Sequence, residues 1–304
     1  MKIIGTGLSG LVGSRVVELL FDKYQFISFS LDSGVDITDF SLLKEKFLEN
    51  KETEIVLHLA AFTDVNKAWK QNNEKNGTCY KVNVLGTRNI AKLCRQNKKY
   101  LIHISTDFVF DGKNAPPGGY REDDKPCLLK KEWYGKTKYL AEEEVKKSGC
   151  NFVIFRIAFP FKAKPSPKNL EPQIKLDLIR RIKKGLEEKK TLYMFADQII
   201  TPTFIDDIAK TILHSIRAKP QGIYHCTGSS KLSPYQIANK IAQEFDFDKS
   251  LIKKASLKKF LREYPNSRPR QQNLSMSNKK IKKDLGIKML TFDEALKKIK
   301  AQLQ

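Results

Sequence analysis

The sequence predicts an α/β fold in which a doubly wound parallel sheet is accompanied by a smaller C-terminal lobe. Short apolar runs without polar alternation recur through the first half of the chain, as expected for parallel strands that are covered on both faces. Amphipathic stretches with helical periodicity lie between these runs, at spacings typical of strand–helix–strand crossovers. A glycine-rich segment directly follows the first apolar run.

Five apolar runs predict strands, and four amphipathic stretches predict the helices between them. The expected strands are Lys2 to Gly5, Phe26 to Leu31, Glu54 to Ala60, Leu101 to Ser105 and Phe152 to Arg156. The expected helices are Gly10 to Asp22, Phe40 to Glu49, Tyr80 to Gln96 and Glu132 to Lys147. This alternation predicts a first domain over residues 1–159.

The sequence pattern changes after Phe159. A proline-broken loop is expected from Lys162 to Asn169, followed by a basic helix around Leu176 to Lys190. Two later runs resemble strands, Leu192 to Phe195 and Gly222 to Cys226. We therefore expect the first domain to resume over residues 191–228, which leaves residues 160–190 and 229–304 for the smaller lobe.

The composition excludes several classes of protein. The 304 residues are 40% hydrophobic and 30% charged, which favours a globular protein over a disordered one. Five cysteines, an odd number without a C-x-x-C pair, predict neither a disulfide framework nor a zinc site. The apolar runs are too short for a signal peptide or a membrane span, so the cytoplasm is the expected location.

The net charge of +22 raises the question of an anionic partner. The surplus is mostly lysine and is spread over the whole chain, without an arginine–aromatic stripe. Binding sites for single-stranded nucleic acid also need stacking aromatic side chains. We therefore interpret the lysines as a solvated surface and predict neither a specific nucleic-acid partner nor a membrane partner.

Four glycines connect the first predicted strand to the first predicted helix: Gly5, Gly7, Gly10 and Gly13. Glycine permits positive φ and close approach of a ligand to the backbone. A helix N-terminus adds free amide donors and the positive end of the helix dipole. The G-x-x-G-x-x-G spacing from Gly7 to Gly13 therefore predicts a loop that binds the pyrophosphate of a dinucleotide.

Asp32 closes the second predicted strand. A carboxylate at this position accepts hydrogen bonds from the adenosine ribose hydroxyls and repels a 2′-phosphate. The sequence therefore predicts NADH or NADPH as cofactor, with Asp32 favouring NADH. Asp36 is a nearby competitor for this role, and a simple turn is the alternative function of either aspartate.

Tyr134 and Lys138 are four residues apart in a predicted helix and thus share one face, although a solvated helix face would show the same spacing. A neighbouring ammonium lowers a phenol's pKa, so we expect Tyr134 to act as a general acid near neutral pH. Thr106 ends the fourth predicted strand, where ligands of open α/β sheets bind, and is expected to hold a substrate carbonyl. Three roles stay open for Asp107: capping a turn, contacting substrate or satisfying local amides.

The four histidines lie in or beside apolar segments without metal-ligand spacing: His58, His103, His214 and His225. We expect buried or strand-end histidines and no metal. The chain also lacks the G-x-S-x-G elbow of hydrolases and the G-x-x-x-x-G-K-[ST] loop.

The sequence resembles the extended short-chain dehydrogenase/reductase family, and within it the dTDP-4-dehydrorhamnose reductase group, nearly from end to end. The matching segments are Gly7 to Gly13, Val35 to Asp39, His58 to Thr63, Asn83 to Asn89, Ser105 to Gly112, Tyr134 to Lys138, Asp197 to Gln198, Thr201 to Thr203, Gly222 to His225 and Arg268 to Pro269. The resemblance implies a Rossmann-type cofactor domain and a substrate-binding lobe.

The resemblance also implies roles for individual residues. Gly10, Leu11 and Val12 would meet the pyrophosphate, Asp32 the ribose, Asp36 and Ile37 the adenine, and Ala60, Ala61 and Phe62 the central part of the cofactor. Tyr134, Lys138 and Thr106 become the catalytic residues, with Tyr134 and Lys138 also at the cofactor and Thr106, Asp107 and Phe159 at the substrate. The sequence departs from the group at Phe108, where Tyr is common, at Phe159, near a common Trp, and at Ile200, where Gly is usual.

The predicted function is NAD(P)H-dependent reduction of the 4-keto group of a nucleotide-activated deoxysugar, with dTDP-4-dehydro-L-rhamnose as the first candidate. One alternative is a nucleotide-sugar epimerase or dehydratase. Another is a non-catalytic subunit resembling the regulatory subunit of methionine adenosyltransferase. A homodimer stays an open possibility.

Overall fold

The computed structural model describes residues 1–163 and 176–303, and these residues form two compact units. The first unit contains residues 1–109, 130–156 and 209–224. The second unit contains residues 110–129, 157–208 and 225–304, apart from those not described. The predicted loop from Lys162 to Asn169 lies largely outside the described residues.

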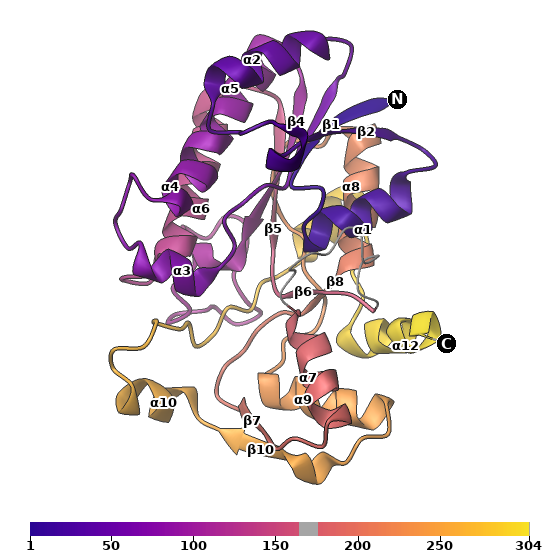
Figure 1. The fold of residues 1–304 in the computed structure, drawn as a ribbon. Coiled ribbons are helices and arrows are strands. Elements are labelled where there is room, and N and C mark those ends of the chain that lie inside the picture. Colours follow the sequence, from indigo (N-terminus) through magenta and orange to yellow (C-terminus); the bar gives the residue numbers. More distant parts are fainter. Residues whose placement is uncertain (164–175, 304) are drawn as a thin grey trace. The chain divides into compact units, whose positions relative to one another are not determined.

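A six-stranded sheet forms the centre of the first unit, in the order β2-β1-β3-β4-β5-β9 (Figure 1). Its strands are β1 (Lys2–Thr6), β2 (Gln25–Phe29), β3 (Ile55–His58), β4 (Tyr100–Thr106), β5 (Phe152–Ile157) and β9 (Gly222–His225). β1 pairs in parallel with β2 and β3, and β3 pairs in parallel with β4. This arrangement confirms the predicted parallel α/β class.

Helices cover both faces of this sheet. They are α1 (Leu11–Leu20), α2 (Phe40–Glu49), α3 (Val65–Lys70), α4 (Thr78–Tyr80), α5 (Thr87–Gln96), α6 (Trp133–Ser148) and α8 (Ile205–Ala218), which enters the first unit at Ala209. Figure 1 shows α2, α5 and α6 along one face, and α1 and α8 along the other. Buried side chains from α2, α5 and α6 pack against strand residues such as Ile4, Val56 and Leu101, which is why these strands are apolar throughout.

The stretch predicted as one helix from Tyr80 to Gln96 is interrupted by a wider turn. Residues Lys81–Gly86 form a π-helix between α4 and α5. Such turns are rare and occur often at functional sites. Here the π-helix places the buried amide of Asn83 beside the loop that follows β3.

The second unit has its own strands, helices and core. Two parallel pairs join β7 (Leu192–Phe195) to β10 (Ile252–Ala255) and β6 (Pro160–Phe161) to β8 (Thr203–Phe204). Its helices are α7 (Leu178–Glu187), α9 (Pro234–Glu244), α10 (Leu257–Glu263), α11 (Lys279–Leu285) and α12 (Phe292–Leu303). Buried isoleucines of α7 and α9 share one apolar cluster with Leu296 and Phe292 of α12.

The observed boundaries differ from the expected domains, and residues 110–129, which we expected in the first domain, belong to the second unit. We expected the first domain to resume at residue 191, but Leu192–Phe195 pairs with β10 and belongs to the second unit. Residues 209–224 are the segment that returns to the first unit. An isolated apolar run identifies a strand but not its partner, because pairing depends on residues about 60 positions away in this case.

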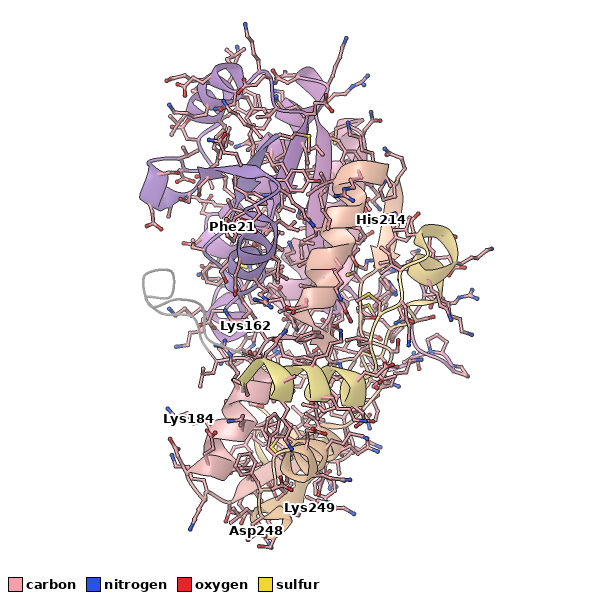
Figure 2. All side chains as sticks on the ribbon, turned by 90° about the vertical axis from the view of Figure 1, so that its right-hand side faces the viewer. Phe21, Lys162, Lys184, His214, Asp248 and Lys249 are labelled. Carbon is pink, nitrogen blue, oxygen red and sulfur yellow. The ribbon has the colours of Figure 1, made fainter. Side chains whose placement is uncertain are left out.

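Many of the lysines lie at the surface, as the example of Lys184 and Lys249 shows (Figure 2). Several form exposed ion pairs, including Lys240 with Asp293 at 2.8 Å. Exposed pairs of this kind contribute little to stability. Among the described residues, no helix combines the length and apolar character needed to cross a membrane.

Candidate active site

The predicted glycine loop adopts the close packing that requires glycine. Gly7 has a φ of 66°, and a Cβ atom there would lie 2.5 Å from the amide nitrogen of Ala60. A Cβ on Gly13 would lie 2.3 Å from the carbonyl oxygen of Gly7. Both contacts involve backbone atoms, which cannot move aside as a flexible side chain can. Only glycine therefore allows β1, α1 and the loop after β3 to approach so closely.

The N-terminus of α1 presents free amide groups at this loop. Gly10 is the N-cap residue, and no side chain caps the helix. The Gly10 amide is bonded to the Gly7 carbonyl at 3.1 Å, which shapes the turn. The following amides of Leu11, Val12 and Gly13 belong to the uncapped first turn, where an anionic ligand finds donors and a favourable dipole. This cradle fits the pyrophosphate of a dinucleotide.

The residues predicted to bind the adenosine part of the cofactor lie just after β2. β2 ends at Phe29, so Asp32 does not close the strand but lies exposed in a short 3-10 turn, Leu31–Ser33. Ser30 and Ser33 form a reciprocal capping box around this turn. Asp36 accepts hydrogen bonds from the amide and hydroxyl of Thr38, both at 2.8 Å. The Asp36 carboxylate is thus partly engaged by Thr38, whereas the Asp32 carboxylate is exposed in the 3-10 turn.

A chain of buried polar groups supports the loop after β3. The Thr6 hydroxyl lies 2.7 Å from Nδ1 of His58, whose Nε2 lies 2.9 Å from the Thr87 hydroxyl. The amide of Ala60 donates to the Thr6 hydroxyl at 3.1 Å. Burial, aided by the Lys138 charge, lowers the pKa of His58 to about 3. His58 is therefore a neutral structural residue that positions the backbone of Ala60.

The sequence did not identify Asn83 as a site residue. It showed only that Asn83 begins one of the segments that resemble the reductase family. Its Oδ1 accepts from the Phe62 amide at 2.7 Å, and its Nδ2 donates to the Phe62 carbonyl at 3.3 Å. Nδ2 also donates to the Thr137 hydroxyl on α6 at 3.0 Å. Asn83 thus links the loop after β3 to the helix that carries Tyr134. An asparagine within a helical stretch was the available signal, because a buried amide needs partners.

The α6 helix brings Lys138 to the end of β4. Glu132 caps α6 by accepting from the amide of Gly135 at 2.5 Å. Lys138 lies four residues after Tyr134, is buried, and donates from Nζ to the carbonyl of Ile104 at 2.7 Å. Burial lowers the pKa of Lys138 from 10.5 to about 8, although the Glu142 carboxylate opposes this shift. The ammonium is therefore oriented by β4.

The expectation that the pKa of Tyr134 is lowered was wrong. Burial raises it, and the nearby Asp107 carboxylate raises it further. The nearby Thr106 hydroxyl opposes this shift in part. The ring of Phe108, which stands where tyrosine is common, packs edge-on against Tyr134 with ring centroids 5.5 Å apart. Tyr134 therefore carries its proton at neutral pH and is set up as a proton donor.

Thr106 and Asp107 form the other half of this cluster. The Thr106 hydroxyl donates to Oδ1 of Asp107 at 3.0 Å and accepts from the Phe108 amide at 3.3 Å. Burial raises the pKa of Asp107 from 3.8 to about 7, although the Thr106 bond opposes the shift. The structure thus brings Thr106, Asp107, Tyr134 and Lys138 together in the first unit.

Phe159 and Ile200 belong to the second unit. Phe159 has a φ of 41°, unusual for an aromatic residue, and its side chain packs against the apolar cluster of that unit. Its predicted substrate contact stays a prediction. Ile200 is completely buried and forms a bridge of two 3.0 Å backbone hydrogen bonds with Leu232. Among the described residues, no group of three His, Cys, Asp or Glu is arranged to hold a metal ion.

The chain is similar to a protein-family model and to known proteins over most of its length. The family model described as RmlD substrate binding domain matches residues 1–304. The probable low-salt glycan biosynthesis reductase Agl14 of Haloferax volcanii is 28% identical over 97% of this chain and 96% of its own. The dTDP-4-dehydrorhamnose reductase of Aggregatibacter actinomycetemcomitans is 27% identical over 99% and 98% of the two chains.

A solved structure shows the same fold. The dTDP-4-dehydrorhamnose reductase of Bacillus anthracis, in complex with NADP, superimposes with a TM-score of 0.85 at 24% identity, covering 99% of both chains. The fold and the site together define a Rossmann-type oxidoreductase that uses a nicotinamide cofactor. Within this class, the chain belongs to the RmlD substrate binding domain family, which confirms the resemblance found in the sequence.

Proposed function

We propose that this protein reduces the 4-keto group of a nucleotide-activated deoxysugar with NADH or NADPH, and that dTDP-4-dehydro-L-rhamnose is the substrate to test first. The observation that carries the proposal is the cluster of Thr106, Tyr134 and Lys138 at the carboxyl end of β4. Ligands of open α/β sheets bind at this end of the strands. The names of the similar reductases support the same reaction class.

The cofactor would be held by the glycine cradle and the loop after β3. Gly7, Gly10, Leu11, Val12 and Gly13 would bind the pyrophosphate through backbone amides, since the first turn of α1 is uncapped. Asp32 would bind the adenosine ribose, with Asp36 and Ile37 near the adenine and Ala60, Ala61 and Phe62 near the middle. The bound nicotinamide supplies the hydride.

The chain's own residues would manage the proton. Thr106 holds the substrate carbonyl oxygen through its hydroxyl, and Tyr134 gives its phenolic proton to that oxygen as negative charge develops. Burial keeps the phenol protonated until then. Lys138, fixed by the Ile104 carbonyl, places a positive charge beside the phenolate that forms and binds the nicotinamide ribose.

We assign NADH as the preferred cofactor because Asp32 is exposed in the turn after β2. A carboxylate there repels a 2′-phosphate. Replacing Asp32→Ser should improve the Kd for NADPH relative to NADH by at least tenfold. An unchanged ratio would remove Asp32 from this role. The second unit, with Phe159, is our candidate for the nucleotide-sugar site.

The decisive experiment supplies dTDP-4-dehydro-L-rhamnose and follows the absorbance of NADH and, separately, of NADPH. The dTDP-4-keto-6-deoxy-glucose isomer serves as the substrate control. Tyr134→Phe should abolish turnover while leaving cofactor binding intact, because only the proton donor is removed. Tyr139→Phe, on the same helix, is the matched control and should retain activity. Wild-type turnover in Tyr134→Phe would refute the assigned role.

A further inference from the structure

Two residues that directly follow β7, Asp197 and Gln198, hold two separate segments of the second unit. Asp197 accepts hydrogen bonds from the Ser256 hydroxyl at 2.7 Å and from the Leu257 amide at 2.6 Å, at the start of α10. The side-chain amide of Gln198 donates to the carbonyl of Gln271 at 2.9 Å. This Asp-Gln pair, which belongs to the segments that resemble the reductase family, therefore attaches α10 and the segment around Gln271 to the end of β7.

Backbone hydrogen bonds extend this attachment. The Ile199 amide donates to the carbonyl of Gln272 at 2.8 Å, and the Ile199 carbonyl accepts from the amide of Leu274 at 2.9 Å. Residues 271–274 are therefore held along residues 198 and 199. Arg270 directly precedes this segment, so its backbone position is fixed as well.

The guanidinium of Arg270 packs against an aromatic ring of α10. Its Cζ lies 5.5 Å from the centroid of the Phe260 ring. Phe260 also contacts Phe195, at the end of β7, with ring centroids 5.7 Å apart, and Tyr264, with centroids 5.0 Å apart. A guanidinium over a ring gains cation–π attraction, and its N–H groups remain able to bind an anion.

Arg270 differs from the buried arginines of this protein because it has no charged partner. Arg156 forms an ion pair with Glu142 at 2.7 Å, and Arg180 forms one with Asp177 at 2.6 Å. Arg270 is half-buried, and its Nε is buried without a hydrogen-bond partner among the described residues. No described carboxylate forms an ion pair with it. A charge buried in this way is costly, which indicates that an anionic ligand completes the site.

A phosphate group is the anion that fits this guanidinium best. The planar fork of N–H groups on arginine matches two phosphate oxygens, and the hydrogen bonds are charge-assisted. Burial lowers the pKa of Arg270, and the charge of Arg181 lowers it further, so the cost of burying the guanidinium is not offset within the described residues. The proposed substrate offers a diphosphate, whereas its sugar is uncharged.

We propose that Arg270 binds the diphosphate of the nucleotide-sugar substrate, from a position that Asp197, Gln198 and Phe260 fix. This inference rests on the proposed function and names the part of the substrate that Arg270 recognises. Arg270 is thus a substrate-binding residue, and the other three are positioning residues. The diphosphate does not react in the proposed reduction, so Arg270 should affect substrate binding more than the chemical step.

Binding calorimetry of Arg270→Gln with dTDP and with UDP tests this inference, at about 0.15 M salt, where exposed charges are screened. Both probes carry a diphosphate, and neither can be reduced. The Kd of the probe that wild type binds more tightly should rise by about 10- to 100-fold, because charge-assisted hydrogen bonds are lost. The matching nucleoside, without phosphate, should bind both proteins equally to within about twofold. Arg262→Gln removes the same charge from an exposed position of α10 and should change the Kd by less than about threefold.

The cofactor also carries phosphates, so its binding is measured in the same way. The Kd values of NADH and NADPH should be the same in Arg270→Gln and wild type. An equal weakening of cofactor binding would assign Arg270 to the cofactor and overturn the proposal. Unchanged binding of dTDP and UDP in the variant would overturn it too, as would a wild-type protein that binds neither probe.

The stability of the free protein separates a binding role from a structural one. Arg270→Gln should have the urea midpoint of wild type or a higher one, because the variant no longer buries a charge without a partner. If Arg270→Gln does not fold, Arg270→Lys replaces it. Lysine keeps the charge but loses the planar fork, so the Kd of the nucleotide should still rise by about three- to tenfold. An unchanged Kd in Arg270→Lys would then overturn the proposal.

Steady-state kinetics separates this inference from the proposed function. The KM for the nucleotide sugar should rise by about 10- to 100-fold in Arg270→Gln, with kcat changed by less than about threefold. A wild-type KM in an active Arg270→Gln enzyme would overturn the phosphate site and leave the proposed reduction standing. Absence of wild-type turnover, together with dTDP or UDP binding that depends on Arg270, would refute the reduction and leave the phosphate site standing.

Discussion

Replacing Lys138→Met should stabilise the first unit while abolishing the proposed reduction. Lys138 is buried, and its pKa is lowered from 10.5 to about 8. A difference of 2.5 between these values corresponds to roughly 3 kcal/mol of unfavourable folding free energy for the protonated lysine. The bond to the Ile104 carbonyl, 2.7 Å long, is lost in the variant. We therefore expect a net gain of about 1–3 kcal/mol at pH 7.

The pH dependence of this gain follows from the sign of the shift. Between pH 8 and 10.5 the unfolded lysine binds a proton that the folded one has lost, so wild-type stability rises with pH across this window. The advantage of Lys138→Met should therefore shrink as the pH rises from 8 to 10.5.

The assay is urea unfolding of the wild type and the variant at a series of pH values, with the free energy of unfolding compared at each pH. Lys136→Met, an exposed position on the same helix, is the control and should change stability by less than about 0.5 kcal/mol at every pH. A destabilised Lys138→Met protein, or a difference that does not vary with pH, would refute the reasoning.

Three further predictions concern stability. Burial is the chief cause that lowers the pKa values of His58 and His103. The free energy of unfolding should therefore fall as the pH drops below 6.5, by up to about 1.4 kcal/mol per pH unit for each histidine. A free energy of unfolding in urea that stays constant between pH 6.5 and 4 would contradict this. Glu142→Gln should cost about 3–5 kcal/mol in the same assay, because the buried Arg156 guanidinium, 2.7 Å away, loses its charged partner; a cost below 1 kcal/mol would be inconsistent with that burial. Asn83→Leu should cost about 2–4 kcal/mol of unfolding free energy, because the amide and carbonyl of Phe62 in the loop after β3 lose their hydrogen-bond partner. The same variant should bind the cofactor more weakly in calorimetry. Unchanged affinity would separate this residue from the site.

Local patterns in the sequence predicted much of the first unit. The helix expected from Phe40 to Glu49 has these same bounds in the structure. In the second unit, the strand expected from Leu192 to Phe195 also has the predicted bounds. The end of the strand that begins at Gln25 was predicted two residues too late, so Asp32 falls in the turn that follows the strand. Strand ends depend on pairing with neighbours, which no local pattern contains.

The glycine cradle was predictable because the spacing of its glycines to the following helix is visible in the sequence. A Cβ on Gly13 would meet the nearby carbonyl oxygen of Gly7, whereas a Cβ on Gly7 would meet the backbone of Ala60, a contact that only the fold creates. The hydrogen bonds between Asn83 and Phe62 were not predictable, because the two residues are 21 positions apart. Long-range partners of this kind appear only once the chain has folded.

The sequence by itself determined the parallel α/β class, the cradle and the residues that form the candidate site, because periodicity, glycine spacing and residue type act over short stretches of chain. Only the tertiary structure decided the ionisation of that site. The pKa of Tyr134 was expected to be lowered by the neighbouring Lys138. Instead, burial raises the pKa of the Tyr134 phenol and lowers that of the Lys138 ammonium. Burial is set by distant segments that pack around a residue, and in this cluster it outweighs the effect of neighbouring charges.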